Sequence, residues 1–464
     1  MMNRISSILL IIVLAATIIL RTQGTETLLI ASSIAVVLFL AMTWKKHSRA
    51  GKIFIIANIT LVSIYWGQGV DWAVIKVGFD RVNLFSAFMV ALLFLRVAAK
   101  RSDIIARCGH FLVHQKPSAR YAVLSYGSWL IGAVLSFGAL NLMGQVISSG
   151  NTLEFAKGDT RIHQIRKKRM VLAMMRGFGA LPLSSPFSIS MALMLSLIPA
   201  LRWQSLLPLT FGVAVSLIAL GWLMDTRAYA YAKGRAQDVT HRKKDILALF
   251  QFALIVIVLF GASASFSQAF DYGLPTSILI MCPIFGVMWF MLEGTIGGSG
   301  VTTLAVALPR DLMRELGALA PEIAVIGGAS FLGALVSGIL EPETVMAVSK
   351  TLYLHGYPLA VFCMAVVVLT SLVGVSPFVS VSILGATFSD VMVFGLSPYV
   401  LSISLLIGWF LALNASPLTI SAIMVARILN CEPKDITLRW NGRYSIAATL
   451  LGAVALYGFH LLYD

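Results

Sequence analysis

Two octapeptides that read alike lie inside apolar segments far apart in the chain. Residues 183–190 read LSSPFSIS, and residues 414–421 read NASPLTIS. Proline within a helix costs about 3 kcal/mol but is favoured in the first turn, and serine is a preferred N-cap. Each segment therefore predicts a break inside an apolar helix, with a new helix beginning at Ser185-Pro186 and at Ser416-Pro417.

A second, looser pair of segments repeats at a similar interval. Residues 136–144 read SFGALNLMG, and residues 376–385 read SPFVSVSILG, about 240 positions further on. Internal similarity of this kind indicates that one structural unit occurs twice. Ser376-Pro377 predicts a further helix start within the apolar part of the chain.

The composition indicates an all-α integral membrane protein. Of the 464 residues, 58% are hydrophobic and only 12% are charged, whereas about a quarter of an average soluble domain is charged. Apolar runs such as 5–20, 28–42 and 246–262 approach the ~17–25 residues of a membrane-spanning helix. The alternation typical of a porin-like barrel is missing from the sequence. Run 5–20 lacks a following signal-cleavage pattern, so we expect it to be a membrane helix.

The net charge of +15 is explained by orientation rather than by nucleic-acid binding. When the apolar runs are threaded in order, about thirty Lys and Arg fall on one side and about five on the other, which is the positive-inside pattern. The clusters on the first side are 45–52, 96–120, 157–169, 227–244, 310–314 and 427–443. We therefore expect a bacterial-type inner-membrane protein with a cytoplasmic N-terminus, a periplasmic C-terminus and no nucleic-acid partner.

This threading requires that segments 121–147 and 357–389 enter and leave on the same side, as re-entrant hairpins. Such backbone is tolerated at membrane depth only when it is buried in protein or lines a water-filled cavity. The count becomes about eleven transmembrane helices plus two hairpins. The two Ser-Pro runs then point in opposite directions, so the halves are inverted repeats with broken helices at the midplane, as in many secondary transporters.

The predicted domain organisation follows from this threading. Its parts are two peripheral N-terminal helices (1–50), repeat 1 (51–225, hairpin 121–147, broken helix 173–200), a cytoplasmic linker (226–244) and repeat 2 (245–464, hairpin 357–389, broken helix 397–427).

Helix starts inside a membrane present free N–H groups and partial positive charge, which suits an anion. Hydroxyl and amide side chains beside them are candidate substrate- or ion-binding groups. The candidates are Ser184, Ser185, Ser188, Ser190, Asn414, Ser416, Thr419 and Ser421 at the breaks, and Ser136, Asn141, Ser376 and Ser380 at the hairpins. The alternative is an ordinary proline kink with Ser and Thr bonded to the preceding turn.

On these residues the chain resembles the ion transporter superfamily, nearest to the divalent anion/sodium symporters. The resemblance implies homodimers, an elevator motion and substrate carboxylates and sodium bound at hairpin tips and broken helices. That branch carries Ser-Asn-Thr signatures at these places. None of the four segments here contains a strict Ser-Asn-Thr.

The predicted function is secondary active transport of a small organic anion, coupled to Na⁺ or H⁺. The alternatives are a lipid or lipid-phosphate flippase, a cation/proton antiporter and a membrane-embedded glycan or lipid enzyme. An antiporter needs a midplane carboxylate, for which Glu293 and Asp390 are the candidates. An enzyme is not expected, because no long outer loop occurs in the threading. The chain has no G-x-x-x-x-G-K-[ST] loop for ATP.

Other residues predict structural roles. The four cysteines are scattered, so we expect no disulfide frame and no metal cluster, and no cofactor except Na⁺ as a coupling ion. Arg176 lies in the helix that leads to the first Ser-Pro. Snorkelling to the inner headgroups accounts for this arginine, with substrate gating as the alternative.

Overall fold

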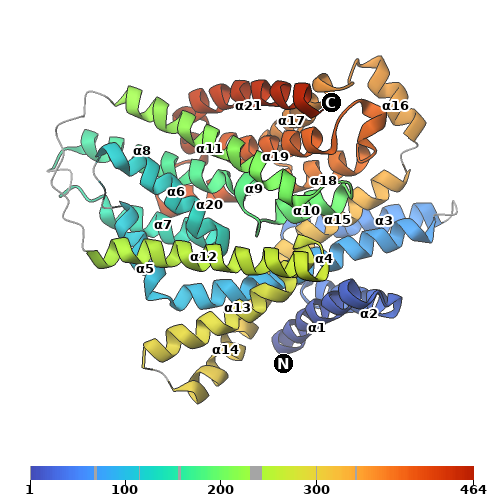
Figure 1. The fold of residues 1–464 in the computed structure, drawn as a ribbon, viewed down its shortest axis with the longest axis horizontal. Coiled ribbons are helices and arrows are strands. Elements are labelled where there is room, and N and C mark those ends of the chain that lie inside the picture. The colour runs from blue at the N-terminus through green and yellow to red at the C-terminus, as the bar shows by residue number, and fades with distance from the viewer. Residues whose placement is uncertain are drawn as a thin grey trace.

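The computed structural model describes residues 2–66, 71–113, 115, 117–154, 158–229, 243–298, 300–339 and 342–463, and every regular element in these ranges is a helix. Two N-terminal helices, α1 (Met2–Gln23) and α2 (Glu26–Met42), pack together at one edge of the molecule, where α1 also contacts α4, α13 and α14 (Figure 1). The protein is an all-α integral membrane protein, as the composition predicts.

One group of long helices is built around α4 (Trp72–Arg101), most of whose residues are buried. It packs against α13 (Leu274–Ile296) and α15 (Ala320–Ile339). The other members are α3 (Arg49–Trp66), α12 (Lys243–Phe270) and α14 (Val301–Leu316). Two ion pairs of 2.7 Å, Lys100–Glu315 and Arg101–Asp311, join the end of α4 to α14.

A second group contains two helical hairpins and two broken helices. The hairpins are α6 (Pro117–Leu135) with α7 (Phe137–Gly150), and α17 (Tyr357–Leu372) with α18 (Pro377–Thr387). The first broken helix is α8 (Thr160–Gly179), α9 (Leu181–Ser184) and α10 (Ile189–Leu197), and the second is α19 (Pro398–Ala415) and α20 (Ile420–Ile428). These elements match the predicted hairpins and breaks.

Short elements and two long helices complete the chain. Helices α11 (Trp203–Ala228) and α21 (Gly442–Tyr463) follow the broken helices, and α5 (Asp103–Val113) and α16 (Pro342–Thr351) precede the hairpins. The 3₁₀ turns are η1 (Trp44–Lys46), η3 (Gly317–Leu319) and η4 (Val391–Phe394), and η5 (Asp435–Trp440) is a π-helix. Residues 230–242, the centre of the predicted linker, lie outside the described residues.

In the described chain, nine helical segments are long and apolar enough to cross a membrane, when each broken helix and the run α14–η3–α15 are each counted once; about eleven were predicted. The difference is explained by the N-terminal region. Helix α2 has only 17 residues, and α3 carries Arg49 and Lys52 in its first turn.

Contacts between the halves repeat with the symmetry of an inverted pair. A Cβ added at Gly144 in α7 would lie 3.0 Å from Ile428 in α20, and one added at Gly385 in α18 would lie 2.8 Å from Leu197 in α10. Each hairpin thus packs on the half-helix of the opposite repeat. Aromatic pairs repeat as well, with centroids 5.6 Å apart for Phe137–Phe178 and 5.9 Å apart for Phe378–Trp409. These reciprocal contacts are expected of two repeats related by a two-fold axis.

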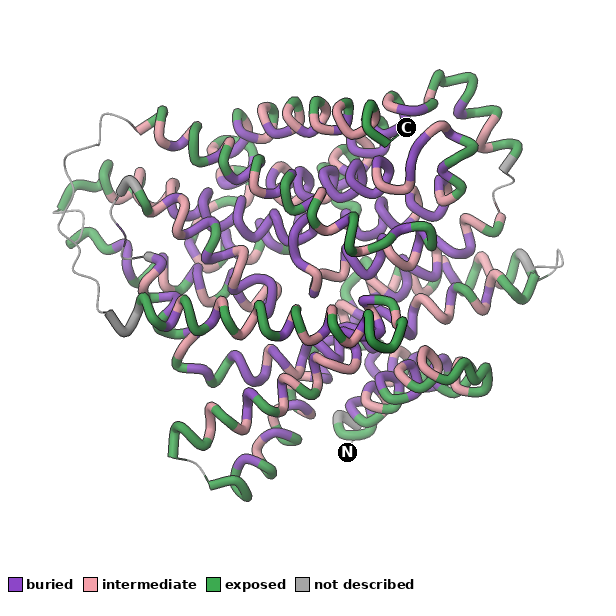
Figure 2. The backbone as a smooth tube through the Cα atoms, in the orientation of Figure 1, coloured by how far each residue is buried: buried purple, intermediate pink, exposed green. Residues whose placement is uncertain are grey.

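Burial follows the same organisation. Buried residues concentrate around α4 and the broken helices, whereas α12 and α21 each have one buried face and one exposed face along their length (Figure 2). Many of the exposed residues of these two helices are large and apolar, for example Phe250, Ile257 and Leu450. Such faces suit lipid, because hydrocarbon does not oppose their exposure.

Candidate substrate site

The two breaks have the same backbone conformation. Ser185 and Ser416 end the preceding helices at φ −98°, ψ 120° and φ −88°, ψ 125°. Ser188 and Thr419 begin the following helices at φ −80°, ψ 143° and φ −70°, ψ 146°. Ser185 and Ser416 are 231 residues apart in the sequence, and so are Ser188 and Thr419. The Ser-Pro-x-Ser/Thr sequence therefore specifies one local structure twice.

The predicted helix starts are wrong by three residues at these breaks. Ser185 and Ser416 are C-caps of the preceding helices, and the new helices begin at Ile189 and Ile420. The N-caps are Ser188, whose Oγ accepts from Met191 N at 3.2 Å, and Thr419, whose Oγ1 accepts from Ala422 N at 3.4 Å. The hydroxyl of a residue in the turn caps the helix better than the serine before proline, because only it reaches the N3 amide.

Ser376, in contrast, is the N-cap of α18 with Pro377 in the first turn, as predicted, although its side chain makes no cap hydrogen bond.

The first break is lined by buried hydroxyls. Ser184 Oγ donates to Ala180 O and accepts from Trp129 Nε1 of α6, both at 2.6 Å. Ser190 Oγ donates to Pro182 O at 3.1 Å, so it spans the break. Ser185 is 2% exposed, and its hydroxyl has no hydrogen-bond partner among the described residues. This hydroxyl is therefore available for a bound ion or substrate.

The second break contacts the tip of the hairpin of its own repeat. Ser416 Oγ donates to Ser371 O at the end of α17, at 2.6 Å. Ser421 Oγ donates to Thr419 Oγ1 at 3.2 Å. The Asn414 amide donates to Phe410 O at 2.9 Å, while its carbonyl oxygen is buried without a hydrogen-bond partner in the described chain.

The hairpin candidates have different surroundings. Ser136 forms the turn between α6 and α7 with φ 51° and is half-buried. Ser380 is buried and shares a hydrogen bond of 2.6 Å with Thr370 across the second hairpin. Asn141, in contrast, is exposed.

Arg176 of α8 is buried in protein, and the snorkelling interpretation is wrong. It is 4% exposed. Its Nε donates to Asn441 Oδ1 at 2.9 Å, and Nη1 donates to Tyr121 OH at 3.0 Å. Its guanidinium lies 3.9 Å from the centre of the Tyr444 ring, a cation–π contact. Sequence reasoning missed this role, although an arginine in the apolar run 170–190 was a signal.

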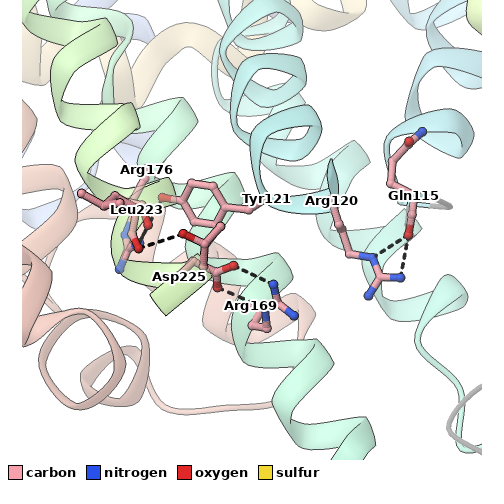
Figure 3. A network of polar contacts seen from close by, with 9 residues as sticks. Gln115, Arg120, Tyr121, Arg169, Arg176, Leu223 and Asp225 are labelled. Atoms are coloured by element: carbon pink, nitrogen blue, oxygen red, sulfur yellow. Dashed lines mark hydrogen bonds and ion pairs between the residues drawn. The ribbon is translucent and has the colours of Figure 1, made fainter. Parts of the chain in front are cut away.

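Figure 3 shows Arg176 beside Tyr121, with the ion pair Arg169–Asp225 close by. Arg169 Nη2 lies 2.7 Å from Asp225 Oδ2. Among the described residues, no carboxylate forms an ion pair with Arg176 itself. The guanidinium is held by neutral groups, so this part of the site keeps an excess of positive charge.

The Arg176 network extends to the second break. Asn441 follows the π-helix η5 and donates to Asn414 O at 2.9 Å. The Asn414 amide also lies against Gly179 at the end of α8, where no side chain would fit. This network therefore connects the α6–α7 hairpin, the first broken helix and the second break through Tyr121, Arg176, Asn441 and Asn414.

The carboxylates considered for proton coupling have structural partners or lie at the surface. Glu293 Oε1 accepts from Asp103 N at 2.8 Å, and Oε2 accepts from Trp289 at 3.3 Å. Asp390 is exposed. Across the described ranges, no group of three or more His, Cys, Asp or Glu could hold a metal ion.

Two cavities lie at the far ends of the half-helices. The first, about 840 Å³, is between the end of α10 and the α12–α13 turn, and the second, about 690 Å³, is between the end of α20 and the start of α8. Neither includes the breaks themselves.

Comparison with known proteins bears on the fold. No protein-family model matches the chain, and no curated protein matches it. Among solved structures, the chain is similar to the Alcanivorax borkumensis YdaH transporter, whose crystal structure is described as revealing an unusual topology. The TM-score is 0.60 at 15% identity, over 89% of this chain and 99% of that chain. The chain therefore has a membrane-transporter fold, while membership of the ion transporter superfamily stays a prediction.

Proposed function

We propose that the protein is a secondary transporter of a small organic anion. The observation that carries the proposal is the matched pair of breaks, each followed by a half-helix that is capped by a hydroxyl and that packs on the opposite hairpin. Two half-helices of nine residues place their partially positive N-termini in the interior. The buried Arg176 adds a full positive charge nearby. An anion is the ligand that this electrostatic arrangement favours.

The coupling ion is proposed to be Na⁺ rather than H⁺. Two buried oxygens at the breaks, Ser185 Oγ and Asn414 Oδ1, have no hydrogen-bond partner in the described residues. Neutral oxygens of this kind suit a hard cation. Proton coupling would need a carboxylate at the breaks, and of the two considered, Glu293 is hydrogen-bonded to Asp103 N and Trp289, and Asp390 is exposed.

We further propose an elevator-type motion. The α4-centred group would be the static part, and the hairpins with the broken helices would be the moving part. The reciprocal packing of α7 on α20 and of α18 on α10 supports this division, because it ties both breaks into a single body.

Uptake into proteoliposomes tests the proposed function. The purified protein is reconstituted, and uptake of labelled mono-, di- and tricarboxylates is measured with and without inward Na⁺ and pH gradients. We expect saturable uptake of one class, driven by Na⁺. No saturable uptake of any anion, with transfer of a labelled lipid between leaflets instead, would favour the flippase alternative.

The antiporter alternative has one observation in its favour, the buried carboxylate of Asp225. Its ion pair with Arg169 indicates a structural role. If Asp225→Asn abolished pH-dependent cation flux while anion uptake was undetectable in the unmodified protein, the antiporter would replace the anion carrier.

A further inference from the structure

The two cavities occupy equivalent positions in the two repeats. Residues that line the first correspond to residues that line the second at the interval of the breaks. The pairs are Ser196 and Arg427, Pro199 and Asn430, and Gln204 and Asp435. The cavities are therefore one feature of the repeat, formed at the end of α10 in one half and of α20 in the other.

Each cavity contains an arginine without a partner. The guanidinium groups of Arg202 and Arg427 make no hydrogen bond or ion pair with any described residue, and both residues are exposed. The other cations in the linings are engaged. Arg21 pairs with Asp80, Arg439 pairs with Asp435, and Lys167 donates to Leu429 O.

Acidic residues in the linings offset part of this charge. With Arg21 paired to Asp80, the first cavity has Asp271 against Arg202. With Arg439 paired to Asp435, the second cavity has Glu432 against Lys167 and Arg427, which is an excess of one positive charge. An unpaired charge in a surface depression attracts small ions of opposite sign.

Each cavity lies at the far end of the half-helix that begins at a break. Ser196 and Arg427 each lie eight residues beyond the N-cap of their half-helix, which is about 12 Å at 1.5 Å per residue. The charge pattern predicts that the first cavity faces the periplasm and the second faces the cytoplasm.

We infer that these cavities are the outer and inner loading sites for the anion, and that Arg202 and Arg427 capture it on the two sides. The inference rests on the proposed function. The site is specific for small anions with exposed negative oxygens, which an arginine binds through its planar donors. Each loading site would concentrate the anion before it reaches a break.

Charge-selective thiol labelling tests the inference without a transported substrate. In a Cys431→Ser background, Ser196→Cys places a thiol in the first cavity. Its reaction rates with an anionic and a cationic methanethiosulfonate reagent are compared in right-side-out vesicles. For the second cavity, the same two reaction rates are measured at native Cys431, which lines it, in inverted vesicles.

We expect Arg202→Gln to lower the anionic-to-cationic rate ratio at Ser196→Cys by about three- to tenfold, since a unit charge a few ångströms away acts oppositely on the two reagents. Arg427→Gln should do the same at Cys431. Lys350→Gln, which removes an exposed cation on the predicted outer face but outside the cavity, should leave both ratios unchanged.

An unchanged ratio in Arg202→Gln or Arg427→Gln would overturn the inference, as would reaction of Ser196→Cys from the inner side only. Because the reagents need no transport, this failure is distinct from failure of the proposed function, which appears as absent anion uptake by the unmodified protein.

Discussion

The two breaks have the same backbone conformation but different neighbouring side chains. Arg176 precedes the first break, and the position that corresponds to it in the second half is Ile407, which is fully buried. Asn414 precedes the second break, and Leu183 corresponds to it in the first half. The shared residues build the turn, whereas the residues that differ bring the charge and the amide. The positions at which the two repeats differ, Arg176 and Asn414, are therefore the positions where we expect contacts that select a particular substrate.

The largest change in stability should come from removing the buried charge of Arg176, which the second repeat lacks. Arg176→Met leaves Asn441 and Tyr121 without their donor and should lower the free energy of unfolding by about 3 kcal/mol. Ile407→Met, at the corresponding position, keeps the volume and should cost under about 1.5 kcal/mol. Unfolding temperatures in detergent give both values, and equal shifts would contradict a special role for Arg176.

Close helix packing in the two halves can be compared through a glycine pair. A Cβ at Gly177 would collide with the Ser125 carbonyl oxygen, and one at Gly408 would lie 2.9 Å from the Met364 carbonyl oxygen. Gly177→Ala should therefore destabilise by about 2 kcal/mol and Gly408→Ala by less, since overpacking costs ~1–3 kcal/mol. Gly212→Ala, with open space around its Cβ, is the control. A Gly408→Ala variant less stable than Gly177→Ala would reverse the comparison.

The two serines before proline should differ in stability. Ser416→Ala loses the hydrogen bond to Ser371 O and should cost about 1 kcal/mol. Ser185→Ala loses no intramolecular hydrogen bond, because the Ser185 hydroxyl has no partner among the described residues, so its effect should stay within about 0.5 kcal/mol. Melting temperatures of both variants, measured without added anion or Na⁺, test this difference. Equal losses would mean that Ser185 has a structural partner.

The smallest effect concerns thiols on the predicted cytoplasmic side. Burial raises the pKa of the Cys108 thiol in α5 to about 12. Burial also raises the pKa of Cys431, while nearby Lys167 opposes this rise. A raised pKa leaves less of the reactive thiolate at pH 8. Cys431 should therefore be alkylated before Cys108, which should stay unreacted. The rate at Cys431 should increase with pH. Mass spectrometry after timed iodoacetamide treatment reads out both sites, and faster modification of Cys108 would contradict the burial.

The sequence predicted the features that depend on local pattern. Ser-Pro within apolar runs located both breaks, and the one-sided distribution of Lys and Arg located both hairpins. It did not predict the helix starts at Ile189 and Ile420, because capping depends on which hydroxyl reaches the N3 amide. The role of Arg176 depends on Tyr121 and Asn441, which are distant in the chain. No local pattern identifies such partners, or the contact between Gly179 and Asn414.

The most direct test of the central claim compares anion uptake by unmodified protein and by the Ser185→Ala/Ser416→Ala variant in the same proteoliposomes. Ser216→Ala, which removes an exposed hydroxyl bonded only to Gly212 O of its own helix, is the matched control. We predict that gradient-driven uptake is lost in the double variant and retained in the control, with the double variant still folded. Undiminished uptake by the double variant would contradict a substrate site at the breaks.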